Sequence, residues 1–111
     1  MSGTPPAPAP RTLGILLATP EGEASTETVL ALARACVARG DEVLLYLVDE
    51  GVRNLLREDV SALGSEPGVR LYCCAYGAQR RGIPRAGRAV FCGLYLLHTV
   101  LRASDRFLAF T

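Results

Sequence analysis

The apolar residues of this chain fall into short runs separated by longer segments with helical spacing. Runs at residues 12–18, 43–48, 89–92 and 106–110 are too short for helices, and a further run at 69–74 is rich in β-forming residues. Continuous apolar runs of this length are typical of strands buried on both faces of a parallel sheet. The pattern therefore predicts five strands.

Helix signals fill the segments between these strands. A broad apolar stripe predicts a long helix, which Ser25 or Thr26 could cap. It runs to about Arg39 and ends at Gly40. The alternation of strands and helices predicts a three-layer α/β/α sandwich around a mostly parallel five-stranded sheet. Shorter helices or helical turns are expected at 52–56, 60–63, 75–81 and 94–103.

The composition is that of one globular domain. The chain has 111 residues, half of them hydrophobic, and a formal net charge of +1. Residues 12–111 are enough to bury a core as a single domain, and the Pro/Ala-rich residues 1–11 are predicted to be a disordered tail. The near-neutral charge gives little support for a nucleic-acid partner. No apolar run reaches the roughly 18 residues needed to cross a bilayer, so no membrane association is expected.

The chain has four cysteines, Cys36, Cys73, Cys74 and Cys92. Because no secretion signal is recognisable, we expect reduced thiols and a cytoplasmic location. The spacing contains no pair of C-x-x-C units, which argues against a zinc site. No glycine-rich phosphate loop follows the first strand, which argues against nucleotide binding, and we expect neither a cofactor nor a metal. Cys36 lies on the apolar stripe of the long helix and is assigned to the core.

Cys73 and Cys74 lie where the strand at 69–74 gives way to a helix. A thiol at this position has free backbone N–H groups beside it, and these favour the reactive thiolate. Cys74 is therefore a candidate nucleophile or sulfur carrier. The alternative is that both cysteines are packing residues, since free cysteine is among the most buried residue types.

The carboxyl ends of parallel strands meet at one edge of the sheet, where ligands gather. Asp49 and Glu50 end the second strand, so they either shape a pocket beside Cys74 or form a solvated turn. Cys92 ends another strand and could supply a second thiol. Cys73 could form a vicinal disulfide with Cys74 or pack in the core.

Five other polar and aromatic side chains lie near these cysteines or in the following helix. Tyr72 and Tyr76 flank the cysteines and could line the site or an oligomer contact. Arg80 and Arg81 either dock an acidic partner or form a solvated helix end. His98, the single histidine, is expected to border the apolar face of its helix in a structural or interface role.

Four short motifs follow one another along the chain. Ala38-Arg39-Gly40 ends the long helix, and an acidic-Gly-Val turn follows the second strand at 49–52. Arg80-Arg81-Gly82 comes six to eight residues after Cys74, and Phe91-Cys92-Gly93-Leu94 leads through a helix to residues 104–107. In this order the motifs resemble the DsrE/DsrF-like family, which includes TusD-type subunits of bacterial sulfur relays. The resemblance extends from about residue 12 to residue 110.

The resemblance implies a small α/β protein that accepts sulfane sulfur on Cys74 as a persulfide and passes it to a partner protein. It also implies sulfur donor and acceptor proteins as partners, and assembly into a homotrimer or homohexamer, or into a hetero-oligomer with paralogues. Two other functions stay open. The chain could be a non-catalytic assembly or binding subunit with buried cysteines, or a small-molecule-binding α/β domain.

Overall fold

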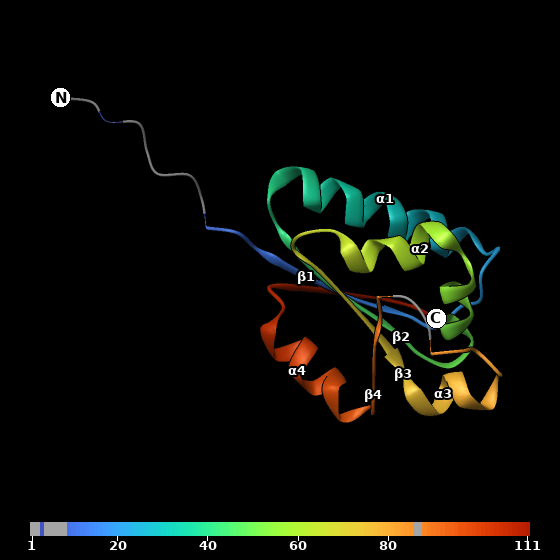
Figure 1. Ribbon diagram of the computed structural model, residues 1–111. Coiled ribbons are helices and arrows are strands. Elements are labelled where there is room, and N and C mark those ends of the chain that lie inside the picture. The colour runs from blue at the N-terminus through green and yellow to red at the C-terminus, as the bar shows by residue number, and fades with distance from the viewer. Residues whose placement is uncertain (1–2, 4–8, 86–87) are drawn as a thin grey trace.

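Five strands form one sheet in which every neighbouring pair is parallel (Figure 1). The computed structural model describes residues 3, 9–85 and 88–111. The spatial order is β4-β3-β2-β1-β5, so β4 and β5 are the two edges. The five predicted strands and the α/β fold are confirmed. The strands are β1 (Thr12–Leu17), β2 (Glu42–Leu47), β3 (Val69–Cys74), β4 (Val90–Cys92) and β5 (Arg106–Phe110).

Helices cover both faces of the sheet (Figure 1). The helices α1 and α2 lie on one face, and α4 lies on the other, with α3 beyond the end of β3. Two 3₁₀ helices, η1 and η2, precede and follow α2. The bounds are α1 (Ala24–Arg39), η1 (Asp49–Leu56), α2 (Glu58–Ala62), η2 (Leu63–Ser65), α3 (Ala75–Arg80) and α4 (Tyr95–Ala103).

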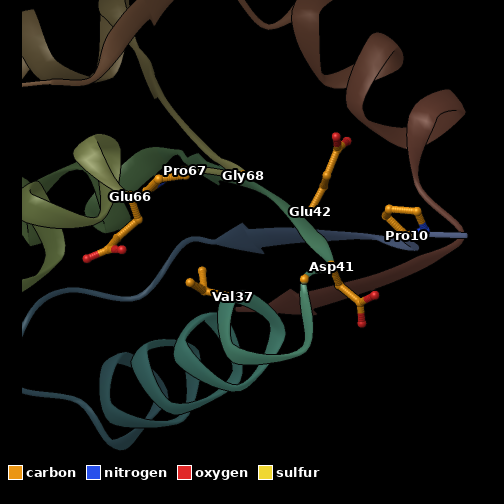
Figure 2. A pocket seen from close by; sticks show the side chains of 8 residues that line it. Pro10, Val37, Asp41, Glu42, Glu66, Pro67 and Gly68 are labelled. Atoms are coloured by element: carbon orange, nitrogen blue, oxygen red, sulfur yellow. The ribbon is translucent and has the colours of Figure 1, made fainter. Parts of the chain in front are cut away.

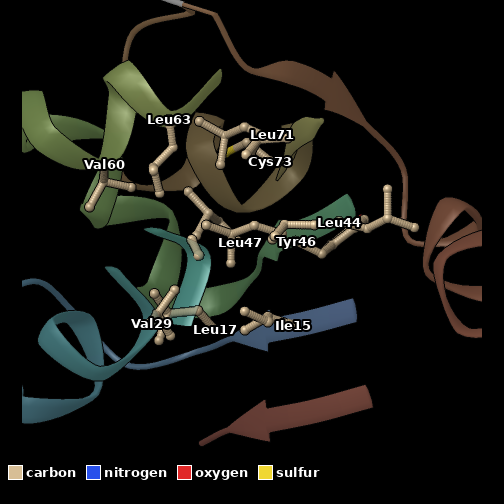
Figure 3. Packing of buried hydrophobic residues seen from close by; sticks show 14 of the residues in the cluster. Ile15, Leu17, Val29, Leu44, Tyr46, Leu47, Val60, Leu63, Leu71 and Cys73 are labelled. Atoms are coloured by element: carbon tan, nitrogen blue, oxygen red, sulfur yellow. The ribbon is translucent and has the colours of Figure 1, made fainter. Parts of the chain in front are cut away.

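The hydrophobic core lies mainly between the sheet and the α1/α2 layer (Figure 3). Ile15, Leu17 and Leu47 are fully buried there, and Val29 of α1 and Val60 of α2 pack against them. Strand residues alternate between the two faces. Because both faces of each central strand are covered, apolar residues are needed at successive positions, and a continuous apolar run results.

The expected cap of the first long helix was wrong. The helix begins at Ala24 after Glu23, and no side chain caps it. Thr26 lies inside the helix and is fully buried, and its hydroxyl donates to the side chain of Asn54, 2.6 Å away. The Thr26 hydroxyl therefore bonds to a distant side chain and not to a backbone N–H in the first turn of its own helix.

Two further predictions concern the N-terminal tail and membrane-spanning segments. The disordered tail predicted at 1–11 falls largely outside the described residues, which begin with residue 3 and continue from residue 9. Within the part of the chain that the structure describes, no helix combines the length and the apolar character needed to span a bilayer.

Candidate functional site

Cys74 is the last residue of β3 and the residue that caps α3. Its Sγ accepts a hydrogen bond from the backbone N–H of Gly77, with 3.4 Å between the two atoms. The helix has only six residues, so it has no long helix dipole, and the Gly77 N–H is a donor directed at the sulfur. Cys74 as a whole residue is 4% exposed.

Cys73 and Cys74 point to opposite faces of the sheet, because adjacent strand residues alternate. Cys73 is fully buried in the α1/α2 layer beside Leu71 (Figure 3). Burial, with smaller contributions from the thiols of Cys74 and Cys92, raises the pKa of Cys73 to about 12. Cys73 is therefore a protonated core thiol on the far side of the strand from Cys74.

Cys92 lies directly beside Cys74, since the two residues are in register on the neighbouring parallel strands β4 and β3. Paired residues of parallel strands project to the same face, so both thiols lie on the α4 side. The Cys92 Sγ is 3.8 Å from the carbonyl oxygen of Cys73, to which it donates. Burial raises the pKa of Cys92, and the nearby Tyr46 hydroxyl opposes that shift.

Tyr46 is the site residue that the sequence did not indicate. It is fully buried in β2, and its hydroxyl donates to the carbonyl oxygen of Gly93 at 2.9 Å. Burial, followed by the thiols of Cys92, Cys74 and Cys73, raises its pKa, so the phenol stays neutral. A tyrosine inside an apolar strand needs a partner for its hydroxyl, which is the signal that could have marked it.

The two acidic residues after β2 lie at the same edge but do not approach the thiols through any hydrogen bond among the described residues. Glu50 is exposed and forms an ion pair with Arg81, the residue that ends α3, at 3.0 Å, and a longer one with Arg53 at 4.0 Å. Arg81 also donates to the Gly77 carbonyl oxygen. Glu50 and Arg81 therefore fasten α3 to η1. Asp49 is exposed and adopts a positive φ of 52°.

A buried polar cluster fixes η1 against the loop after β1. Asn54 is fully buried, accepts from Thr26 and donates to the carbonyl oxygens of Thr19 and Gly51. Each of these groups would be costly to bury without its partner. The cluster holds the strand-end loops in place and was not indicated by the sequence pattern, because its members come from three separate segments.

Several large apolar side chains around this edge are exposed. Tyr76, in the first turn of α3, is 66% exposed, and the guanidinium of Arg80 lies over its ring. Tyr95 and Leu94, after β4, are 77% and 57% exposed. His98 is exposed as well, which differs from the expectation that it borders the apolar face. The buried side of α4 is centred on Val100 instead.

A hollow of about 560 Å³ lies at the opposite edge of the sheet (Figure 2). It is bordered by residues that precede or begin β2 and β3, among them Asp41, Glu42 and Glu66. These are amino-terminal strand ends, whereas Cys74 and Cys92 are carboxyl-terminal ends. The hollow therefore gives no support to the ligand crevice expected beside the cysteines.

Native-state alkylation should distinguish Cys73 from the other thiols. At pH 8 a thiol of pKa about 12 is ionised in only about one molecule in ten thousand, and the thiolate is the reactive form. We expect Cys73 to stay unmodified by iodoacetamide in the folded protein and to react after unfolding in urea. Trypsin leaves Cys73 and Cys74 in one peptide, 71–80, so fragment ions must assign the label. Faster labelling at Cys73 than at the half-buried Cys36 would contradict its placement.

Comparison with known proteins gives a family and several similar solved structures. Residues 12–110 match the family described as DsrE/DsrF-like. Among solved structures, the chain is similar to the YchN protein from E. coli, with a TM-score of 0.75 and 19% sequence identity. The similarity covers 91% of this chain and 99% of that chain. At this identity the likeness shows the fold alone. No curated protein matches the sequence significantly.

Proposed function

Because the chain belongs to the DsrE/DsrF-like family, we propose that it acts as a sulfur carrier, in which Cys74 accepts sulfane sulfur as a persulfide and passes it to a partner protein. The observation that carries this proposal is the hydrogen bond from the Gly77 N–H to the Cys74 Sγ at a strand-to-helix junction. That donor favours a negative charge on the sulfur, which both halves of a transfer reaction need. The described cysteines are all free thiols, as the reducing cytoplasm we propose would keep them.

The chemistry is two successive displacements at sulfur. The Cys74 thiolate attacks the outer sulfur of a donor persulfide, forms a new sulfur–sulfur bond and releases the donor thiolate. The thiolate of the acceptor then attacks the outer sulfur of the Cys74 persulfide, and Cys74 leaves as a thiolate. Cys74 is the leaving group in the second step, and the Gly77 N–H stabilises it there as it does in the first. Neither step consumes an oxidant or a reductant.

The burial of Cys74 favours a second candidate function, a non-catalytic assembly or binding subunit. At 4% exposure the Cys74 residue is as buried as an ordinary core residue. A donor reaches it only if a neighbouring element moves, and β4 is the element best able to do so. It is an edge strand of three residues that pairs only with β3.

Partner proteins and self-assembly fit the exposed side chains beside the site. Tyr76, Leu94 and Tyr95 present large apolar surfaces to solvent around the end of β3 and β4. Aromatic residues of this kind are enriched in protein interfaces. We propose that this surface contacts a sulfur donor, a sulfur acceptor or another subunit. The subunit contact would belong to a homotrimer, a homohexamer or a hetero-oligomer with paralogues.

Mass spectrometry after incubation with a small-molecule persulfide donor tests the proposal. We expect the reduced protein to gain about 32 Da, the mass of one sulfur atom, in a form that dithiothreitol removes. Peptide mapping should place the adduct on Cys74 within peptide 71–80. A protein that gains no mass, and whose Cys74 also resists alkylation in the native state, would instead be the non-catalytic subunit.

A further inference from the structure

We propose that Cys92 is the resolving thiol of Cys74: it attacks the Cys74 sulfur of a persulfide that finds no acceptor, forms a Cys74–Cys92 disulfide and releases sulfide. The inference rests on the proposed function, because the persulfide on Cys74 is its starting point. It adds a second residue to that site. It also adds a step that discharges the Cys74 persulfide when no acceptor takes the sulfur.

The first support is the register of β3 and β4. Cys74 and Cys92 are paired residues on adjacent parallel strands and project to the same face. Adjacent strands lie about 4.8 Å apart, which is within the range of about 4.4 to 6.8 Å between Cα atoms that a disulfide spans. Cys73 cannot take this role, because its side chain projects to the opposite face and is fully buried.

The second support is the direction of the Cys92 thiol. Its Sγ donates to the carbonyl oxygen of Cys73, the peptide group that leads into Cys74, at 3.8 Å. The Cys92 thiol therefore points toward the neighbouring strand β3 and not away from the edge of the sheet. The adjustment that a sulfur–sulfur bond requires falls on β4, because this strand is short and lies at the edge of the sheet.

The surroundings of Cys92 set the order of events. Burial raises its pKa, so at neutral pH the thiol is largely protonated and attacks slowly. The Tyr46 hydroxyl lies beside it and limits this shift. An acceptor thiolate bound at the surface therefore competes well for the sulfur, and Cys92 acts on persulfides that remain.

The step balances without an outside oxidant or reductant. The Cys74–Cys92 bond forms as the bond between the Cys74 sulfur and its outer sulfur breaks. The outer sulfur leaves as hydrosulfide and takes up the proton that Cys92 loses, giving hydrogen sulfide. That sulfur is reduced to sulfide, and the Cys92 sulfur is oxidised to the disulfide level.

The test follows protein that has been loaded with a small-molecule persulfide donor and freed from the excess donor. In the wild type we expect the adduct of about 32 Da to decay to a species about 2 Da lighter than the reduced protein, with one equivalent of sulfide released. Digestion should link peptide 71–80 to peptide 89–102. In Cys92→Ser the adduct should decay at least about tenfold more slowly, without sulfide. Cys92→Ala, which adds no hydroxyl, should behave in the same way, and Cys36→Ser should match the wild type.

Each other result overturns the inference in a recognisable way. Equal decay in wild type and both Cys92 variants, after normal loading of Cys74, removes the resolving role and leaves the sulfur carrier intact. Movement of the adduct to peptide 89–102 makes Cys92 a second carrier instead. Absence of any adduct on Cys74 in all variants removes the proposed function and, with it, this step.

Discussion

Replacing Cys74 with serine is expected to abolish persulfide loading while leaving the fold intact. The hydroxyl of serine is a good helix cap and can accept the same Gly77 N–H that Cys74 Sγ accepts. The buried polar atom is therefore still satisfied, and we expect the free energy of unfolding to change by no more than about 1 kcal/mol. Serine cannot form a persulfide, so loading on peptide 71–80 should fall to background, a loss of about 100-fold or more.

Cys36→Ser is the matched control for this prediction. Cys36 is half-buried on α1, which packs on the other face of the sheet, and its pKa is raised by burial and by Asp41. It should load as the wild type does. If Cys74→Ser took up sulfur at the wild-type level while folded, Cys74 would have no part in the reaction.

Gly51→Ala is expected to produce the largest loss of stability of any conservative substitution near the site. A Cβ on Gly51 would lie on the carbonyl oxygen of Leu17, 2.6 Å from its carbonyl carbon and 3.0 Å from the Cα of Ala18. All three atoms belong to the backbone at the end of β1, so no side chain can rotate away. The same Leu17 oxygen accepts from the N–H of Val48, and that bond between β1 and the end of β2 would be disturbed. We expect the free energy of unfolding to fall by about 3 kcal/mol or more.

Urea denaturation followed by circular dichroism measures this effect, since the chain has no tryptophan. Gly77→Ala is a suitable control because it places the same methyl group at another buried glycine. There the nearest atom outside α3 is the Cγ1 of Val52 at 3.4 Å, an ordinary contact. We expect that variant to remain within about 1 kcal/mol of the wild type. A Gly51→Ala protein as stable as Gly77→Ala would mean that η1 does not pack this closely on β1.

The strands were the part of the fold most readily predicted from sequence. Leu44 and Leu45 project to opposite faces of β2, and both are buried, so apolar residues are required at successive positions. The acidic-Gly-Val turn was predicted only as a motif. The structure gives it a physical reason, because Gly51 is the residue that lets the turn lie against the backbone of β1.

The polar contacts inside the fold could not be predicted in the same way. The hydroxyl of Thr26 was assigned to a local cap, although it bonds to Asn54 on η1. The Tyr46 hydroxyl likewise finds its acceptor at Gly93, after β4. Hydrophobic periodicity identifies which side chains are buried, but a buried hydroxyl is satisfied by whichever segment the tertiary fold places beside it.

The candidate site was predicted in part. The change from β-formers to helix formers located Cys74 at a strand-to-helix junction, and the Gly77 N–H on its sulfur follows from that position. Its neighbour in register on β4, Cys92, can be placed only once the strand order is known. The sequence therefore indicated the reactive atom but not the thiol beside it.

The most direct test of the central claim is a pulse and chase of sulfane sulfur on the wild-type protein. The protein is loaded with a labelled small-molecule persulfide donor, freed of excess donor and then given a low-molecular-weight thiol as acceptor. A carrier should show the adduct of about 32 Da on peptide 71–80 and then lose it as the labelled sulfur appears on the acceptor as persulfide. A protein that never acquires the adduct, or that keeps it in the presence of the acceptor, would contradict the assignment of Cys74 as a sulfur carrier.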